Sequence, residues 1–125
     1  MNITFYHCKK CGNVAVKVHD GGGALVCCGE EMSVLEPNTT DAAVEKHVPV
    51  IKHQEEDVVV QVGSAMHPMV DDHHIEFVAA VYNDRAEVAC LKPGEDPAAE
   101  FTLVGNGKVK AYEYCNKHGL WASEE

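Results

Sequence analysis

The chain has 125 residues, a net charge of −10 at pH 7 and a hydrophobic content of 46%, which suits one ordinary domain or two small ones. The acidic balance argues against a nucleic-acid partner, because phosphate contacts need a basic surface. No apolar run reaches the ~20 residues of a membrane span, and the N-terminal residues lack the apolar segment of a signal peptide. We therefore expect a cytoplasmic protein with no membrane partner.

Residues 1–36 form a compositional block that holds four of the six cysteines. The alternating VAVKV segment predicts a strand over residues 14–18, and HDGGGA at residues 19–24 is typical of a turn. We expect one β-hairpin with a cysteine pair at each end. Because about 36 residues bury too little core to fold alone, a metal ion is expected to hold this block together.

The remaining chain reads as a connector followed by strands. EPNTTDAAVEK, residues 36–46, predicts one helical turn capped by Thr or Asp. Short segments rich in Val, Tyr and Phe then predict strands over residues 57–62, 75–82, 86–91, 99–104 and 108–115. Turn residues separate them at 83–84, 93–94 and 105–107. This pattern predicts an all-β sandwich.

Four cysteines of the first block form a candidate metal site. Cys8 and Cys11 have the CxxC spacing that lets two thiolates bind one ion, and Cys27 and Cys28 supply a second pair. Adjacent side chains of an extended segment point to opposite faces, so this second pair requires a local backbone twist. From the residues alone, an iron site, a structural zinc site, and a vicinal disulfide or free thiols all stay open.

A second group of candidate ligands lies in loops and at strand ends, where sites are commonly built on a rigid scaffold. Its members are His47, His67, His73, Cys115 and His118. Spacing along the chain does not show whether they converge, and a single histidine is more often an ordinary surface or core residue.

Three motifs resemble the signatures of superoxide reductases: EKHVPVI at 45–51, HPM at 67–69 with a histidine six residues after the first, and CNKHGLW at 115–121. CxxCG with a later CC pair resembles the small desulforedoxin-type domain. Together, and over essentially the whole chain, they resemble the desulfoferrodoxins, superoxide reductases with two iron centres. The resemblance implies a rubredoxin/desulforedoxin-like domain over residues 1–36 and an immunoglobulin-like β-sandwich over residues 37–125.

The resemblance also implies ligands for two iron ions per chain. The catalytic iron would take four equatorial histidines and one axial cysteine: His47, His67, His73, His118 and Cys115. The other iron, which zinc can replace, would take Cys8, Cys11, Cys27 and Cys28. His73 is assigned by its spacing from His67, with His74 as the alternative. The remaining histidines, at 7, 19 and 53, are expected to be ordinary exposed residues, and Cys90 a small apolar strand residue.

The activity that the resemblance implies is one-electron reduction of superoxide to hydrogen peroxide without release of dioxygen. Glu45 would occupy the sixth position of the oxidised iron, and Lys46 would attract the anionic substrate; a solvated charge pair is the alternative. Electrons would come from a small carrier such as rubredoxin, and a homodimer is expected. Two other functions stay open: a rubredoxin-like electron-transfer protein, and a non-enzymatic module with zinc in both sites.

Overall fold

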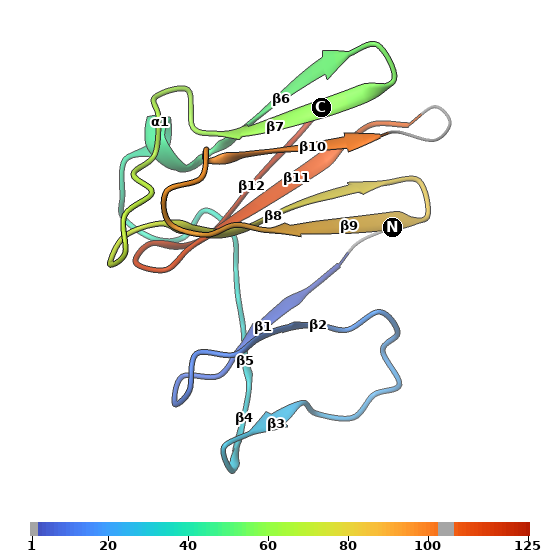
Figure 1. Ribbon diagram of the computed structural model, residues 1–125. Coiled ribbons are helices and arrows are strands. Elements are labelled where there is room, and N and C mark those ends of the chain that lie inside the picture. The colour runs from blue at the N-terminus through green and yellow to red at the C-terminus, as the bar shows by residue number, and fades with distance from the viewer. Residues whose placement is uncertain (1–2, 103–106) are drawn as a thin grey trace. The chain divides into compact units, whose positions relative to one another are not determined.

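The computed structural model describes residues 3–102 and 107–125, and nearly all the regular structure in these ranges is β-strand (Figure 1). The chain divides into two compact units, the first ending at Glu36 and the second running from Pro37 to Glu125. The prediction of an all-β protein is confirmed. The predicted strand residues Leu103 and Val104 lie outside the described residues.

The first unit, where it is described, consists of short antiparallel pairs. Its strands are β1 (Phe5–His7), β2 (Val14–Val16), β3 (Val26–Cys27), β4 (Glu30–Glu31) and β5 (Ser33–Val34). β1 pairs with both β2 and β5, whereas β3 pairs with β4. The prediction of one hairpin that carries both cysteine pairs is therefore wrong. The glycine-rich segment of residues 21–23 links two different sheets, and each cysteine pair has its own turn.

The second unit is a sandwich of two antiparallel sheets. Its strands are β6 (Pro49–Gln54), β7 (Asp57–Val62), β8 (Ile75–Tyr82), β9 (Arg85–Cys90), β10 (Ala98–Thr102), β11 (Lys110–Cys115) and β12 (Gly119–Glu124). One sheet has the order β10-β7-β6 and the other β12-β11-β8-β9. Alternate residues of β7, β8 and β11 fill the space between the sheets, among them Val58, Val60, Val78, Ala80 and Ala111.

Two strands of this sandwich were not among the predicted segments. β6 begins at Pro49, a residue that a strand tolerates at its first position because no ladder donor is needed there. β12 begins inside CNKHGLW, where the ligand-like residues obscured the strand pattern. Its partner β11 fixes it through six pairs, from Lys110 opposite Glu124 to Cys115 opposite Gly119.

The predicted helical turn exists as α1 (Val44–His47), but its predicted cap is wrong. The N-cap residue is Ala43, without a side-chain cap. A loop from the end of β7 holds the turn instead: the Ala65 N–H donates to the carbonyl of Glu45 at 2.9 Å. In the described ranges, no helix is long and apolar enough to cross a membrane.

Three chain segments that carry the predicted ligands lie at one end of the sandwich, on the left in Figure 1. His47 ends α1, His67 and His73 lie in the connection from β7 to β8, and Cys115 and His118 flank the turn from β11 to β12. The antiparallel topology thus brings together residues up to 71 positions apart, such as His47 and His118.

Candidate metal centres

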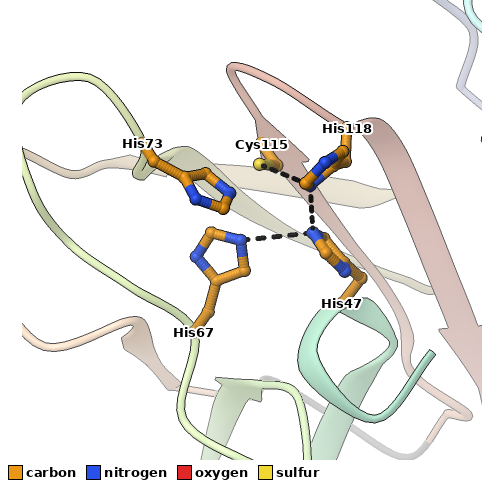
Figure 2. Close-up of side chains that lie close together, drawn as sticks. All are labelled: His47, His67, His73, Cys115 and His118. Carbon is orange, nitrogen blue, oxygen red and sulfur yellow. Dashed lines mark hydrogen bonds between the residues drawn. The ribbon is translucent and has the colours of Figure 1, made fainter. Parts of the chain in front are cut away.

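The structure brings five predicted ligands together at this end of the sandwich (Figure 2). Each offers one nitrogen or sulfur atom, and these atoms all lie within 4.8 Å of one another; the residues are His47, His67, His73, Cys115 and His118. His74 lies outside this group, and its Nδ1 faces the carbonyl of Val70 at 3.2 Å. The convergence that spacing could not establish is therefore present in the fold.

Two of the imidazoles are oriented by backbone carbonyls. Nδ1 of His47 lies 2.7 Å from the carbonyl oxygen of Ala43, and Nδ1 of His67 lies 2.7 Å from that of Pro68. A carbonyl only accepts, so each Nδ1 must carry the proton that it donates. In the neutral ring this leaves Nε2 with an exposed lone pair that points into the group.

These lone pairs provide a test of whether a metal ion fits. Nε2 of His47 and Nε2 of His67 are 3.2 Å apart, a contact dashed in Figure 2. Burial lowers the pKa of His67 to about 4 and also lowers the pKa of His47, so both rings are neutral at pH 7. Two lone pairs facing each other repel unless a cation lies between them. The arrangement therefore fits a bound metal ion.

The other donors point inward as well. Nε2 of His73 is buried and has no hydrogen-bond partner among the described residues. His118 presents Nδ1, which lies 3.1 Å from Nε2 of His47 and 3.9 Å from the sulfur of Cys115. Burial raises the pKa of the Cys115 thiol, which a bound cation would counteract. Four imidazole nitrogens and one sulfur suit a transition metal such as iron.

The strands and an aromatic ring fix this donor set. The register of β11 against β8 shifts between Tyr114, opposite Phe77, and Cys115, opposite Ile75. The extra residue lies on β8, an irregularity of the kind often found next to functional sites. Trp121 stacks on His47, with ring centroids 5.1 Å apart, and its Nε1 donates to the carbonyl of His118 at 3.0 Å. Trp121 thus packs against the site and also anchors one of its loops.

Glu45 and Lys46 are exposed on α1, directly before His47. Lys46 lines a surface hollow of about 410 Å³ together with His67, Met66 and Pro68. The hollow therefore combines a lysine with an imidazole of the group. Glu45 takes part in the fold through its backbone, since its carbonyl accepts from Ser64 Oγ at 3.3 Å.

The four cysteines of the first unit form a second group of donors. Their sulfurs lie within 4.8 Å of one another, and all six cysteines are free. The sulfurs of Cys27 and Cys28 are 3.9 Å apart, too far for a vicinal disulfide. Cys28 has φ of 53° and Gly29 has φ of 78°, which supplies the local twist expected from adjacent ligands.

Neighbouring groups shift the pKa values of these cysteines in opposite directions. The backbone N–H of Cys11 is the main cause that lowers the pKa of Cys8 to about 6. Contact with the Cys11 sulfur is the main cause that raises the pKa of Cys28 to about 12. Four adjacent thiols cannot all ionise without a cation among them, so this group also fits a metal ion.

The other histidines and Cys90 lie outside both donor groups. His19 and His53 are exposed as expected, whereas His7 is half-buried because it lies on β1, the central strand of its sheet. Cys90 ends the edge strand β9 and is exposed. Sequence reasoning missed Glu113, which is fully buried on β11 two residues before Cys115. The strand pattern of KAYEYC could have indicated this, because alternate residues of a strand lie on one face and Glu113 is two positions from Cys115.

The fold and the two donor groups define a class: a β-protein of two units, each with a non-haem metal site. Comparison with known proteins agrees. The family model described as desulfoferrodoxin matches residues 39–124, and the one described as its N-terminal domain matches residues 2–35. The chain belongs to the desulfoferrodoxin family.

Similar proteins match over nearly the whole chain. A desulfoferrodoxin of Syntrophotalea carbinolica is 48% identical over 122 residues, which cover 98% of this chain and 96% of that one. One of Nitratidesulfovibrio vulgaris is 47% identical over 119 residues, 95% of this chain and 94% of the relative. The crystal structure of the superoxide reductase from Treponema pallidum is 30% identical, with a TM-score of 0.82, and covers 98% and 99% of the two chains.

Proposed function

We propose that this protein is a superoxide reductase. Superoxide, one electron and two protons give hydrogen peroxide, and no dioxygen is released. The convergence of four imidazoles and one thiol, with lone pairs that face one another, is the observation that carries the proposal. The similarity to desulfoferrodoxins and to the superoxide reductase of Treponema pallidum supports the same function.

We assign the ligands of two iron ions on this basis. His47, His67, His73, His118 and Cys115 hold the catalytic iron, and the four cysteines of the first unit hold the other. When bound, ferrous iron supplies the electron for superoxide. Because the group offers five side-chain donors, an ion that takes six ligands would keep one position for a small molecule.

Lys46 draws the substrate to this position. With a net charge of −10, most of the surface repels an anion, and a cationic side chain beside the His67 hollow focuses the local potential. Glu45, on the same exposed turn, would supply a carboxylate ligand for oxidised iron. The open hollow gives water access, so solvent delivers both protons to the product.

The cellular setting follows from the same proposal. A small rubredoxin-like carrier returns the electron, and the protein detoxifies superoxide in the cytoplasm as a homodimer. None of the six cysteines, all of which lie in the described ranges, forms a disulfide, a state that suits a reducing compartment. We also propose the domain limits 1–36 and 37–125, which agree with the division of the chain at Glu36.

Counting electrons tests the function. Iron-loaded protein is first reduced and then separated from the electron donor. It is next exposed to a known flux of superoxide under anaerobic conditions. After subtraction of spontaneous dismutation, a reductase consumes about one superoxide per catalytic iron. Consumption then stops until electron donor is added. Consumption that continues without donor would mean dismutation, and consumption at the spontaneous rate would leave an electron carrier or a zinc module.

A further inference from the structure

The imidazole of His73 belongs to a loop of residues 70–74. Its Nε2 points into the donor group and has no hydrogen-bond partner in the described part of the chain. No such bond fixes this nitrogen, so the position of the ring depends on the backbone of its loop. Its own link within that loop is a short bridge, with N–H and carbonyl groups of Val70 and His73 paired at 3.0 and 3.1 Å.

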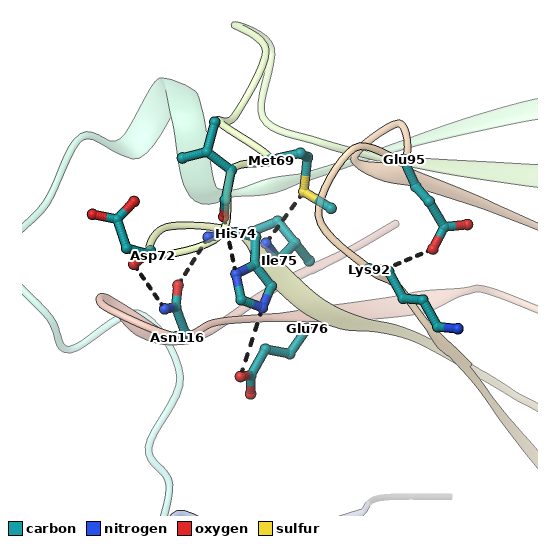
Figure 3. A network of polar contacts seen from close by, with 9 residues as sticks. Met69, Asp72, His74, Ile75, Glu76, Lys92, Glu95 and Asn116 are labelled. Carbon is teal, nitrogen blue, oxygen red and sulfur yellow. Dashed lines mark hydrogen bonds and ion pairs between the residues drawn. The ribbon is translucent and has the colours of Figure 1, made fainter.

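Asn116 holds the loop on both sides of His73 (Figure 3). Its Nδ2 donates to the carbonyl of Asp72 at 3.0 Å, and its Oδ1 accepts from the N–H of His74 at 2.9 Å. A third bond runs from the backbone N–H of Asn116 to the carbonyl of His74 at 3.2 Å. One side-chain amide thus spans the residues directly before and after His73.

The same residue directly follows Cys115 in the chain. Asn116 therefore connects the loop that supplies a sulfur donor with the loop that supplies a nitrogen donor. Neither link involves a donor atom of the group, so the connection does not depend on a bond to the metal ion. An amide side chain donates through Nδ2 and accepts through Oδ1, two separate atoms, so Asn116 can bond a carbonyl and an N–H of different residues at once.

We propose that Asn116 is a positioning residue that fixes His73 relative to Cys115 and so preorganises the catalytic centre. The proposal rests on the proposed function, since it assumes that both residues bind the same ion. Asn116 itself is exposed and is not one of the five donors of the group. Residues that orient ligands typically change metal affinity 10- to 100-fold when they are removed.

The chain offers a matched control. Asn38 makes the same pair of bonds with a single residue of β12: its Nδ2 donates to the carbonyl of Ala122 at 3.1 Å, and its Oδ1 accepts from the N–H of Ala122 at 2.9 Å. Asn38→Ala therefore removes the same two side-chain bonds away from the His73 loop. Because Asn38 has φ of 62°, alanine there adds backbone strain, which makes it a stringent control for general destabilisation.

The test compares wild type, Asn116→Ala and Asn38→Ala by titration with Co²⁺ against a competing chelator. We expect Asn116→Ala to lower affinity at the five-donor group 10- to 100-fold. At saturating Co²⁺, its thiolate charge-transfer band is expected to shift, because the Cys115 sulfur and the His73 ring are no longer held in register. The four-cysteine group, with its own absorption bands, is expected to keep its affinity in all three proteins.

Three other outcomes would contradict either the positioning role or the proposed function. Equal affinity and an unchanged band in Asn116→Ala would overturn the positioning role. An equal loss in Asn38→Ala would also overturn it, because the effect would then be general destabilisation. Wild-type protein that binds Co²⁺ only at the four cysteines would instead contradict the proposed function.

Discussion

At the scale of single residues, charge at the mouth of the site determines how fast an anion arrives. Lys46 is the cation that lines the hollow beside His67, in which Glu95 and Asp96 are also found. Because the hollow also contains two carboxylates and the protein has a net charge of −10, removal of the Lys46 charge leaves only acidic side chains at this approach. The side chain is exposed, so its removal leaves the packing of α1 intact.

We predict that Lys46→Met slows association with superoxide about tenfold at low salt and weakens the salt dependence of the rate. Pulse-generated superoxide and stopped-flow absorbance measure both. Lys108→Met is the control, because Lys108 is exposed and precedes β11, whereas the site lies at the other end of that strand. An unchanged low-salt rate in Lys46→Met would contradict the steering role.

Candidate ligands could be proposed from the sequence where residue type and spacing suggested metal chemistry. These are the CxxC and CC pairs and the histidines of EKHVPV and HPM, and the fold brings them together in two groups. The role proposed for Asn116 could not be predicted, because the partners of its side chain lie in a distant backbone loop. The same holds for the bond that Asn13 Nδ2 donates to the Cys27 sulfur at 3.5 Å. Such hydrogen bonds appear only when the fold brings the segments together.

At the scale of elements, the short helix α1 depends on a glycine in the adjoining loop. Gly63 has φ of 80°, and a Cβ there would lie 2.6 Å from the carbonyl of Ala65 and 2.7 Å from that of Glu45. We predict that Gly63→Ala destabilises the protein by about 2–4 kcal/mol, through clash as well as an unfavourable φ. Chemical denaturation measures the loss.

A second glycine separates the two causes. Gly94 has φ of 91°, but a Cβ there meets nothing within 4 Å. Gly94→Ala should therefore cost only the conformational part, about 1 kcal/mol. Equal losses in the two variants would show that the close approach to α1 is unimportant.

Strand β11 contains a buried carboxyl that its surroundings do not satisfy. Neither oxygen of Glu113 accepts a hydrogen bond from the described residues, and burial raises its pKa to about 9. We predict that Glu113→Val, a change of similar volume, raises the free energy of unfolding by about 1–3 kcal/mol. Denaturation at fixed metal loading measures it. Glu113→Gln keeps the unsatisfied polar atoms, and a gain as large as that of valine would refute the explanation.

Strands were predicted best where the hydrophobic pattern was clear. DVVVQV and IEFVAAVY became β7 and β8 with the predicted bounds, because their side chains fill the core on alternate positions. The cysteine hairpin failed because the glycines of residues 21–23 give no side chains that specify a pairing. The ends of β12 and α1 depended on tertiary contacts that no local pattern records.

At the scale of the whole molecule, the two units carry separate metal groups. We predict that Cys28→Ser abolishes metal binding at the four cysteines but leaves the rate of superoxide consumption in a single turnover within about twofold, since the five-donor group is complete in the second unit.

Metal per chain and the single-turnover rate together measure this independence. Cys90→Ser is the matched control, because Cys90 is equally exposed but lies outside both donor groups. A single-turnover rate that fell with the loss of the first metal would show that the four-cysteine centre takes part in the reaction itself.

The central claim is that this protein reduces superoxide rather than dismutating it. The most direct measurement adds a known flux of superoxide to reduced, iron-loaded protein with an excess of electron donor and counts both products under anaerobic conditions. We predict about one hydrogen peroxide per superoxide, with no dioxygen, as the balance of one electron and two protons requires. About half that peroxide, with dioxygen released, would contradict the account.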